Sequence, residues 1–305
     1  MKNKIRKIKT ISDFHKIRGL PSPQHPLVSL VDYGLSKILP EHIGEHWNFD
    51  FYSIGVKRNV GAIRYGQQKY DFDEGLMSFI APGQILSIEP NTNKANLKPS
   101  GWLFLIHPDF FWNASLSKTI KQYDFFDYSI NEALFMSEKE EDVIEGIFQN
   151  IKQEIENNID NFSESIIIAQ IELLLNYAQR FYQRQFITRK KSSHYKLNEV
   201  EALLNKYFNS EAIINEGLPT VQYIANTLNM SPGYLSSLLK SLTGQTTQQH
   251  IHNKLIEKAK EKLSTTNLSV SEIAYELGFE HSQSFSKLFK TKTNVSPLKF
   301  RASFN

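Results

Sequence analysis

The sequence predicts an α+β protein of two domains: an N-terminal antiparallel β domain that ends in a helical hairpin, and a C-terminal all-helical domain. Three observations lead to this prediction. The chain has 305 residues, which is long enough for two separate hydrophobic cores. Turn residues at short spacing give way to helical periodicity near residue 138. A pair of helices is then repeated near the C-terminus.

Bulk composition limits the classes of protein that remain. Hydrophobic residues make up 40% of the chain and charged residues 22%, as in ordinary globular proteins. The absence of cysteine excludes disulfide bonds and fits a reducing compartment. The basic start, MKNKIRKIKT, is followed by Asp13 and His15 rather than by the apolar run of a signal peptide, and no stretch of about 18 residues is uncharged and apolar. We therefore expect a cytoplasmic protein without a membrane partner.

The basic start itself has two interpretations. It is a solvated tail or an edge strand, or alternatively an arm that enters the minor groove of DNA.

Charge is distributed unevenly along the chain. Residues 188–305 contain 15 Lys or Arg and 9 Asp or Glu, a balance of +6, whereas residues 1–187 contain 20 and 23, a balance of −3. A basic domain suits a polyanion, because neutralising phosphates releases counterions. The polar segment TRKKSSHYK, residues 188–196, is typical of a linker. The sequence thus predicts domains at 1–187 and 197–305.

Short apolar runs separated by turn residues fill the region from about 26 to 108; they include FDFYSIGV, GAIRYG, LMSFIA, QILSIE and WLFLIH. This pattern predicts a small antiparallel β-barrel or sandwich. Metal enzymes with such a barrel gather a His-x-His pair, a Glu and a later His on its wall. His42, His46 and His107 do not follow that pattern. We therefore expect no metal, no cofactor and no catalytic residue.

The region from about 138 to 186 predicts two helices. The first has one apolar face, formed by Val143, Ile144, Ile147, Ile151 and Ile155. The second follows Asp160 and is apolar nearly all round, so it has to be buried on two sides. We expect one side to pack on the first helix and the barrel and the other to form a homodimer contact. Burial of both sides within one chain is the alternative.

The C-terminal region repeats itself at a shift of 49 to 50 residues. The matching positions are Val221, Ile224, Ala225 and Leu228 with Val270, Ile273, Ala274 and Leu277, and Leu235, Leu239, Lys240, Thr243, Gly244 and Thr246 with Phe285, Phe289, Lys290, Thr293, Asn294 and Ser296. One supersecondary unit therefore occurs twice.

Each copy predicts a helix, a tight turn and a second helix. In the second copy, Ser269 and Glu272 form a capping box and Gly278 ends the first helix. In the first copy, Ser231 caps the second helix and Pro232 begins it. Gly244 and Asn294 close the second helices, because both residue types tolerate positive φ. Each copy is therefore a helix-turn-helix unit.

An apolar stripe between the two copies predicts a connecting helix. Ile251, Leu255, Ala259 and Leu263 recur every four residues and define a helix of about 16 residues, or about 24 Å. The predicted C-terminal domain is therefore two helix-turn-helix units joined by one connecting helix.

The segment SVSEIAYELGFEHSQSFSKLFKTKTNVSPLKFR, from Ser269 to Arg301, resembles the AraC/XylS family of bacterial transcription regulators, and so do the connecting helix and the first unit before it. Asn294 replaces the usual Gly, and Lys254 replaces an Arg that is common in the connecting helix. The β region followed by two helices resembles, in its arrangement, the cupin-like sensor and dimerisation domain of this family. The resemblance implies a sequence-specific transcription regulator.

Base readers are predicted from the docking geometry of the motif, since the second helix of each unit lies in the major groove. In the second unit we expect Ser282, Gln283, Ser286 and Lys287 to contact bases, with His281 beside them. In the first unit the exposed positions are Tyr234, Ser236, Ser237 and Lys240, which are weak readers. Lys240 and Lys290 suit phosphates. We therefore expect the second unit to read more sequence; a solvated helix face is the alternative for each residue.

The expected partners follow from this interpretation. They are double-stranded DNA, a second copy of the chain, RNA polymerase and a small effector in the N-terminal barrel. The sequence names neither the effector nor the operator. Two alternatives stay open: an enzyme with an accessory DNA module, and a DNA binder without sequence preference.

Overall fold

The structure is a computed structural model that describes residues 5–36, 39–43, 45–58, 75–87, 100–128, 132–157, 162–188 and 190–303. It divides into two compact units, residues 1–185 and 186–305. The first unit contains β-sheets and helices and the second is helical, so the predicted α+β class is confirmed. The predicted strand at residues 61–66 lies outside the described residues.

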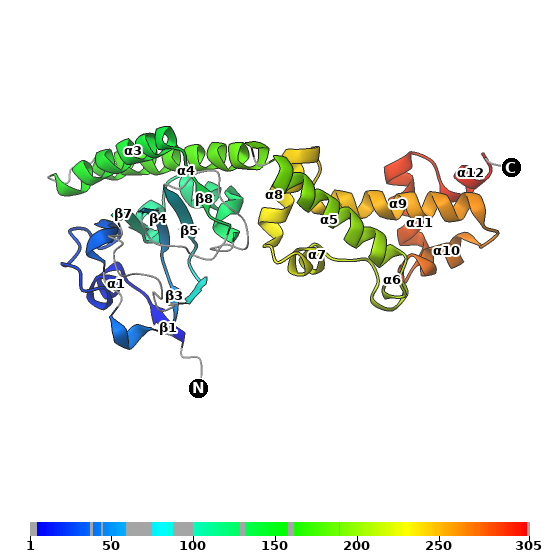
Figure 1. Ribbon diagram of the computed structural model, residues 1–305, viewed down its shortest axis with the longest axis horizontal. Helices are drawn as coiled ribbons and strands as arrows, with labels where there is room; N and C mark the ends of the chain where they lie inside the picture. The colour runs from blue at the N-terminus through cyan, green and yellow to red at the C-terminus, as the bar shows by residue number, and fades with distance from the viewer. Residues whose placement is uncertain are drawn as a thin grey trace. The chain divides into compact units, whose positions relative to one another are not determined.

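Two sheets form the centre of the first unit (Figure 1). The five-stranded sheet is antiparallel throughout and has the order β2-β7-β4-β5-β8. In the three-stranded sheet, β1-β3-β6, the β1 and β3 strands are parallel. The strands are β1 (Ile5–Ile8), β2 (Val28–Asp32), β3 (His46–Phe49), β4 (Tyr52–Arg58), β5 (Leu76–Ile80), β6 (Ile85–Ser87), β7 (Ser100–Ile106) and β8 (Leu134–Phe135).

The barrel of the predicted barrel or sandwich is not confirmed, because the described strands form two separate sheets and close no barrel. Alternating apolar residues do predict a sheet with one face on a core. They do not encode whether the two edges of the sheet meet. Here β2 and β8 end one sheet, and β1 and β6 end the other. The basic start of the chain thus contributes an edge strand, β1, as one of the two interpretations expected.

The apolar residues of β7 alternate between two cores. Leu103 and Leu105 pack with Trp47 and Phe49 of the smaller sheet. Phe104 points the other way, and its ring centroid lies 6.1 Å from that of Phe148. The five-stranded sheet is therefore buried on both faces.

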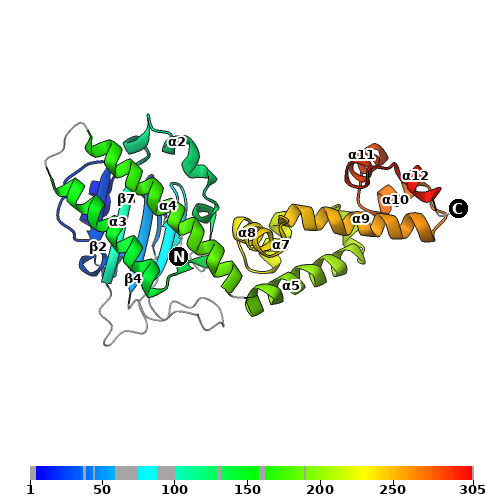
Figure 2. The ribbon, with the colours of Figure 1, turned by 90° about the horizontal axis from the view of Figure 1, so that it is seen from above.

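Two long helices, α3 (Glu138–Glu156) and α4 (Ser163–Thr188), cover the outer face of the larger sheet. Figure 2 shows them side by side across β2, β7 and β4. Ile144, Ile147 and Ile151 of α3 are buried as predicted. Val143 was expected on the same face, but it is 36% exposed, and Phe148 takes the core position instead. An i+4 and i+7 spacing from Ile144 places Phe148 and Ile151 inward and leaves Val143 at the margin.

Short helices complete the first unit. They are α1 (Ile11–Ile17), α2 (Leu116–Thr119) and the 3₁₀ turns η1 (Tyr33–Leu35), η2 (Pro40–His42), η3 (Pro108–Phe111), η4 (Ile120–Gln122) and η5 (Asp124–Asp127). Within the described parts of the chain, no helix is both long and apolar enough to cross a membrane.

The second unit is built around one central helix, α9, which carries the predicted apolar stripe (Figure 1). Ile251, Leu255, Ala259 and Leu263 are at most 1% exposed and belong to a single core shared by both repeats. The helices are α5 (Lys190–Phe208), α6 (Ala212–Glu216), α7 (Val221–Thr227), α8 (Pro232–Thr243), α9 (Thr247–Thr265), α10 (Val270–Glu276), α11 (Ser282–Thr293) and α12 (Pro297–Arg301).

The segment 188–196, predicted as a linker, is mostly helical. Helix α4 ends at Thr188 and α5 begins at Lys190. Because α4 extends beyond residue 185, its last residues belong to the second unit. The linker role and the domain limits at 187 and 197 stay predictions.

One glycine holds the two repeats in a fixed relation. Gly278, in the turn after α10, has a φ of +78°, and a Cβ at this position would clash with the carbonyl oxygen of Ile213 and lie 2.9 Å from the Cα of Gly217. The turn of the second repeat therefore packs directly on the backbone that precedes the first repeat.

We predict that Gly278→Ala destabilises the second unit by about 2 to 5 kcal/mol, the cost of positive φ plus that of overpacking. Gly244→Ala is the matched control, because Gly244 also has positive φ (+74°) but has open space around its Cα; it should cost only about 1 to 2 kcal/mol. Urea unfolding followed by far-UV circular dichroism measures both. Tryptophan fluorescence reports the first unit separately, since Trp47, Trp102 and Trp112 all lie there. Equal losses in the two variants would contradict the close packing at Gly278.

Candidate nucleic-acid interface

The second helix pair forms as its local sequence predicts. Ser269 Oγ accepts the N–H of Glu272 at 3.2 Å, and Glu272 Oε2 accepts the N–H of Ser269 at 2.6 Å, which completes a capping box for α10. Hydrogen bonding of the Glu272 carboxylate to the side chain and the backbone N–H of Ser269 lowers the pKa of Glu272. Helix α11 begins at Ser282 after His281 and ends at Asn294, whose φ is +62°. The capping box therefore fixes the start of the helix pair, and the positive φ of Asn294 fixes its end.

The first helix pair repeats this construction with different residues. Asn229 has a φ of +54° in the turn, where the second pair has Gly278. Ser231 Oγ accepts the N–H of Tyr234 at 3.2 Å and Pro232 occupies the first turn of α8. Helix α8 ends at Gly244 in the left-handed conformation. The repeat seen in the sequence is therefore a repeat in structure.

In each helix pair, buried apolar side chains pack between the two helices, and both pairs pack against α9. Ala225 and Ala274, at equivalent positions, are fully buried, and their small side chains allow the helices to approach closely. Leu235 and Phe285 face them from α8 and α11 and are also fully buried. The outer faces of α8 and α11 are left for solvent or a ligand.

Positive charge is concentrated near α11 and α12. Lys287, Lys290, Lys292 and Lys299 are exposed, and within the described residues none of them pairs with a carboxylate. Three of the four lysines of α9 are different: Lys254, Lys258 and Lys262 pair with Glu257 (2.7 Å), Glu261 (2.9 Å) and Glu276 (2.6 Å). Four lysines without a carboxylate partner among the described residues therefore lie in or beside the second helix pair, where they suit a polyanion.

Comparisons with known proteins agree with this geometry. Residues 224–303 match a family model described as a helix-turn-helix domain. An uncharacterized HTH-type transcriptional regulator of Bacillus subtilis, YfiF, is 30% identical over 146 residues, which are 48% of this chain and 43% of that protein. The HTH-type transcriptional activator RhaS of Escherichia coli is 26% identical over 264 residues, 86% of this chain and 87% of RhaS. The C-terminal region of this chain is a helix-turn-helix domain of the AraC type.

Among solved structures, the C-terminal domain of AraT, a response regulator of Geobacillus stearothermophilus, is similar to this AraC-type domain. Sequence identity is 30%, the match covers 35% of this chain and 84% of AraT's domain, and the TM-score is 0.32. The chain spans less than half of the length of several curated relatives, including YfiF.

The predicted readers of the second repeat lie together on α11 of the AraC-type domain. Gln283 and Lys287 are exposed and one turn apart, so they point to the same side. Ser282 and Ser286 are half-buried beside them, His281 is exposed at the N-cap, and Lys290 is exposed in the last turn. The structure thus brings these six side chains to one face.

The predicted readers of the first repeat are less available. The Tyr234 ring packs edge-on against Phe186, with 5.2 Å between ring centroids. Ser236 Oγ lies 3.1 Å from the buried Oγ1 of Thr247, so that a hydroxyl hydrogen bond joins α8 to α9. Ser237 is half-buried, and only Lys240 of this set is fully exposed. Two of the four side chains therefore already serve internal packing.

Sequence reasoning missed the part of the AraC-type domain that precedes the first repeat. Tyr207 donates its hydroxyl proton to the carbonyl of Gly217 at 3.0 Å, and Gly217 itself has a φ of +77° beside Gly278. Helices α5 and α6 thereby support the turn of the second repeat. Gly217 and Gly278 are visible in the sequence as possible positions of positive φ. The sequence repeat does not indicate that these two glycines lie in contact.

Within the described residues, no group of three or more His, Asp or Glu side chains is arranged to hold a metal ion. His42 is buried near Glu45 (Nδ1 to Oε2, 3.2 Å), and the Glu45 carboxylate accepts hydrogen bonds from Arg6, which lowers the pKa of Glu45 to about 2. These side chains join β1 to β3 and so have a structural role.

We predict that Ser231→Ala costs the AraC-type domain about 1 kcal/mol of stability, because the N-cap of α8 is lost. Ser284→Ala, at an exposed serine inside α11, should change stability by less than about 0.5 kcal/mol. Denaturant midpoints from far-UV circular dichroism provide the comparison. If both variants unfold at the wild-type midpoint, Ser231 does not stabilise the start of α8.

Proposed function

We propose that this protein is a sequence-specific transcription regulator that places α8 and α11 in two successive major grooves of its operator. The observation that carries the proposal is the double helix-turn-helix built on one buried helix. Helix α9 has 19 residues and is therefore about 28 Å long. That length is close to one turn of B-DNA, about 34 Å, so two recognition helices fixed to α9 suit adjacent grooves on one face of the duplex.

Base reading in this proposal falls mainly on α11. Gln283 suits the N6 and N7 atoms of adenine, and Lys287 suits the O6 and N7 atoms of guanine. Lys290, Lys292 and Lys299 lie where they neutralise phosphates, which adds affinity without sequence preference. Helix α8 contributes Lys240 and the partly engaged Tyr234, Ser236 and Ser237, and so it positions the protein more than it reads.

We predict that Gln283→Ala/Lys287→Ala lowers the preference for operator over random DNA by about thirtyfold or more, since two base contacts are lost and each costs about 1 to 3 kcal/mol. The control is Gln153→Ala/Lys206→Ala, which removes the same side-chain types from exposed positions outside both recognition helices. Operator and random duplexes are titrated at one fixed salt concentration, because affinity depends steeply on salt.

An unchanged preference in the double variant would overturn the assignment of α11 as the reading helix. Equal affinity of the wild type for operator and random DNA would instead favour an architectural DNA binder.

The first unit is assigned to sensing and dimerisation in the same proposal. Its two facing sheets are compatible with a cupin-like sandwich, and regulation by a small effector, contact with RNA polymerase and a cytoplasmic location belong to this interpretation. No enzymatic activity is part of it.

Dimerisation is supported by an apolar stripe on α4. Phe162, directly before α4, is 69% exposed; Ile166 and Leu173 are each 43% exposed, and Ala169 is exposed between them. Their spacing of three to four residues places them on one side of the helix. An exposed stripe of this kind on a long helix suits the same stripe of a second copy.

We predict that Ile166→Glu/Leu173→Glu converts a dimer to a monomer, because two carboxylates would be buried without partners at the interface. Ile214→Glu is the control, since Ile214 is 59% exposed on α6 and is not part of the stripe. Sedimentation velocity measures the masses. A wild-type monomer, or a dimer that survives the double change, would exclude this interface.

A further inference from the structure

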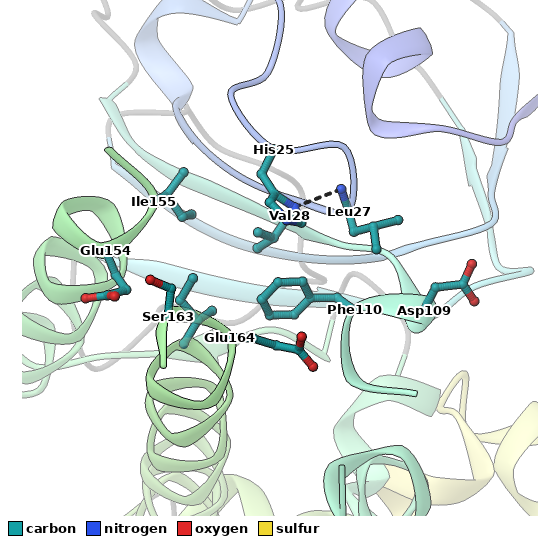
Figure 3. A pocket seen from close by; sticks show the side chains of 10 residues that line it. His25, Leu27, Val28, Asp109, Phe110, Glu154, Ile155, Ser163 and Glu164 are labelled. Carbon is teal, nitrogen blue, oxygen red and sulfur yellow. Dashed lines mark hydrogen bonds between the residues drawn. The ribbon is translucent and has the colours of Figure 1, made fainter. Parts of the chain in front are cut away.

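The first unit contains a cavity of about 350 Å³ at the outer side of β2, away from the core between the two sheets. Its walls come from the segment that leads into β2, from η3, from the end of α3 and from the start of α4. Figure 3 shows the ring of Phe110 in the middle of the lining, with Val28 and Leu27 on one side and Ser163 and Glu164 on the other. The volume lies in the range of small-molecule sites, about 300 to 1,000 Å³.

The floor of the cavity is apolar. Val28, Phe110 and Ile167 line it and are at most 5% exposed. Phe110 is held in place by His25, whose ring meets it edge-on at 5.5 Å between centroids. A ligand therefore meets a fixed aromatic and aliphatic surface, which favours a molecule with an apolar body.

The rim of the cavity is acidic. Glu154, Glu164 and Asp109 line it, and no Lys or Arg among the described residues does so. Neither Glu154 nor Glu164 pairs with a cationic side chain within the described ranges. Glu154 also lies in the last turn of α3, where the helix dipole adds negative potential, while Glu164 places a carboxylate at the opposite, positive end of α4. The rim therefore favours a positive charge.

His25 does not offset this charge. Its Nδ1 accepts the N–H of Leu27 at 3.1 Å, so the neutral ring carries its proton on Nε2. Burial lowers the pKa of His25, against a smaller raising effect of Glu164, and the ring is neutral at neutral pH. Carboxylates without a cation thus face an apolar floor.

The carboxylates are not arranged as a metal site, since the described residues contain no group of three His, Asp or Glu side chains able to hold one ion. We propose that this cavity binds a small organic cation, a protonated amine with an aromatic or aliphatic body, and that Glu154 and Glu164 select its charge while Phe110 and Val28 receive its body. Binding stands on the cavity alone; the role of the amine as an effector rests on the proposed regulatory function.

One helix, α4, lines the cavity with its first turn and ends in the second unit. The first turn of α4 lines the cavity through Ser163 and Glu164, and the same helix continues to Thr188. Its residue Phe186 belongs to the second unit and contacts Tyr234 of α8. The cavity in the first unit is thus lined by a helix, α4, whose last residues belong to the second unit.

The test compares three probes of the same shape in the full chain: 2-phenylethylamine, 2-phenylethanol and 3-phenylpropionate, titrated by calorimetry at neutral pH. The wild type is expected to bind the amine at least about tenfold more tightly than the alcohol, and the carboxylate least, since charge-assisted hydrogen bonds to carboxylates are the strong ones. The variant Glu154→Gln/Glu164→Gln should lose this preference and bind the amine and the alcohol about equally tightly. Equal binding of amine and alcohol by the wild type, or tighter binding of the carboxylate, overturns the proposal.

Matched variants separate a specific site from general charge. Glu138→Gln/Glu156→Gln removes two carboxylates from exposed positions of α3 outside the cavity and should keep the preference for the amine. Ile155→Phe narrows the cavity from a half-buried position and should weaken amine and alcohol alike. Tryptophan fluorescence checks that each variant is folded. A preference that survives Glu154→Gln/Glu164→Gln, or amine binding unaffected by Ile155→Phe, places the amine elsewhere and overturns the proposal.

Operator binding without any probe is measured in the same preparations. Its absence would refute the proposed regulatory function and leave the amine result standing, so the two failures are distinguishable.

Discussion

The buried stripe of α9 is the constraint on which the second unit depends. Ile251, Leu255, Ala259 and Leu263 have almost no exposed surface, and the core around them includes residues of both repeats. Neither repeat is large enough to bury its own apolar faces, because each consists of two short helices. Sharing one central helix solves that problem and also fixes the two recognition helices relative to each other. The close packing of Gly278 on Ile213 and Gly217 further ties the second repeat to the segment that precedes the first.

The contacts that build this shared core also make the two repeats unequal. In the first repeat, α8 uses Ser236 to hold α9 and Tyr234 to meet Phe186. In the second, α11 carries Gln283 and Lys287 in the open, and the unpaired lysines lie nearby. Side chains that stabilise the domain are less available for bases, whereas the exposed Gln283 and Lys287 of α11 make no side-chain hydrogen bond or ion pair among the described residues. The account therefore assigns sequence reading mainly to α11, and affinity and alignment to the rest of the domain.

Local rules explain which features could be predicted from the sequence. The capping residues Ser231 and Ser269, the positive φ of Gly244 and Asn294, and the stripe on α9 follow from helix geometry and were predicted correctly. Features that depend on contacts between residues far apart in the sequence were not predicted. Strand alternation gave no information on whether the sheet closes, helical periodicity misplaced Val143, and nothing in the repeat indicated that Tyr234 meets Phe186. The cavity in the first unit is formed by four separate segments, so its lining emerges only when they are brought together.

The most direct measurement is a base-pair substitution scan through the operator, with binding free energies determined at fixed salt. If α9 holds two unequal readers in adjacent grooves, the costly positions should form two windows about ten base pairs apart, with losses of about 1 to 3 kcal/mol per pair under α11 and smaller losses under α8. A single window, two windows at another spacing, or larger losses under α8 would contradict this account.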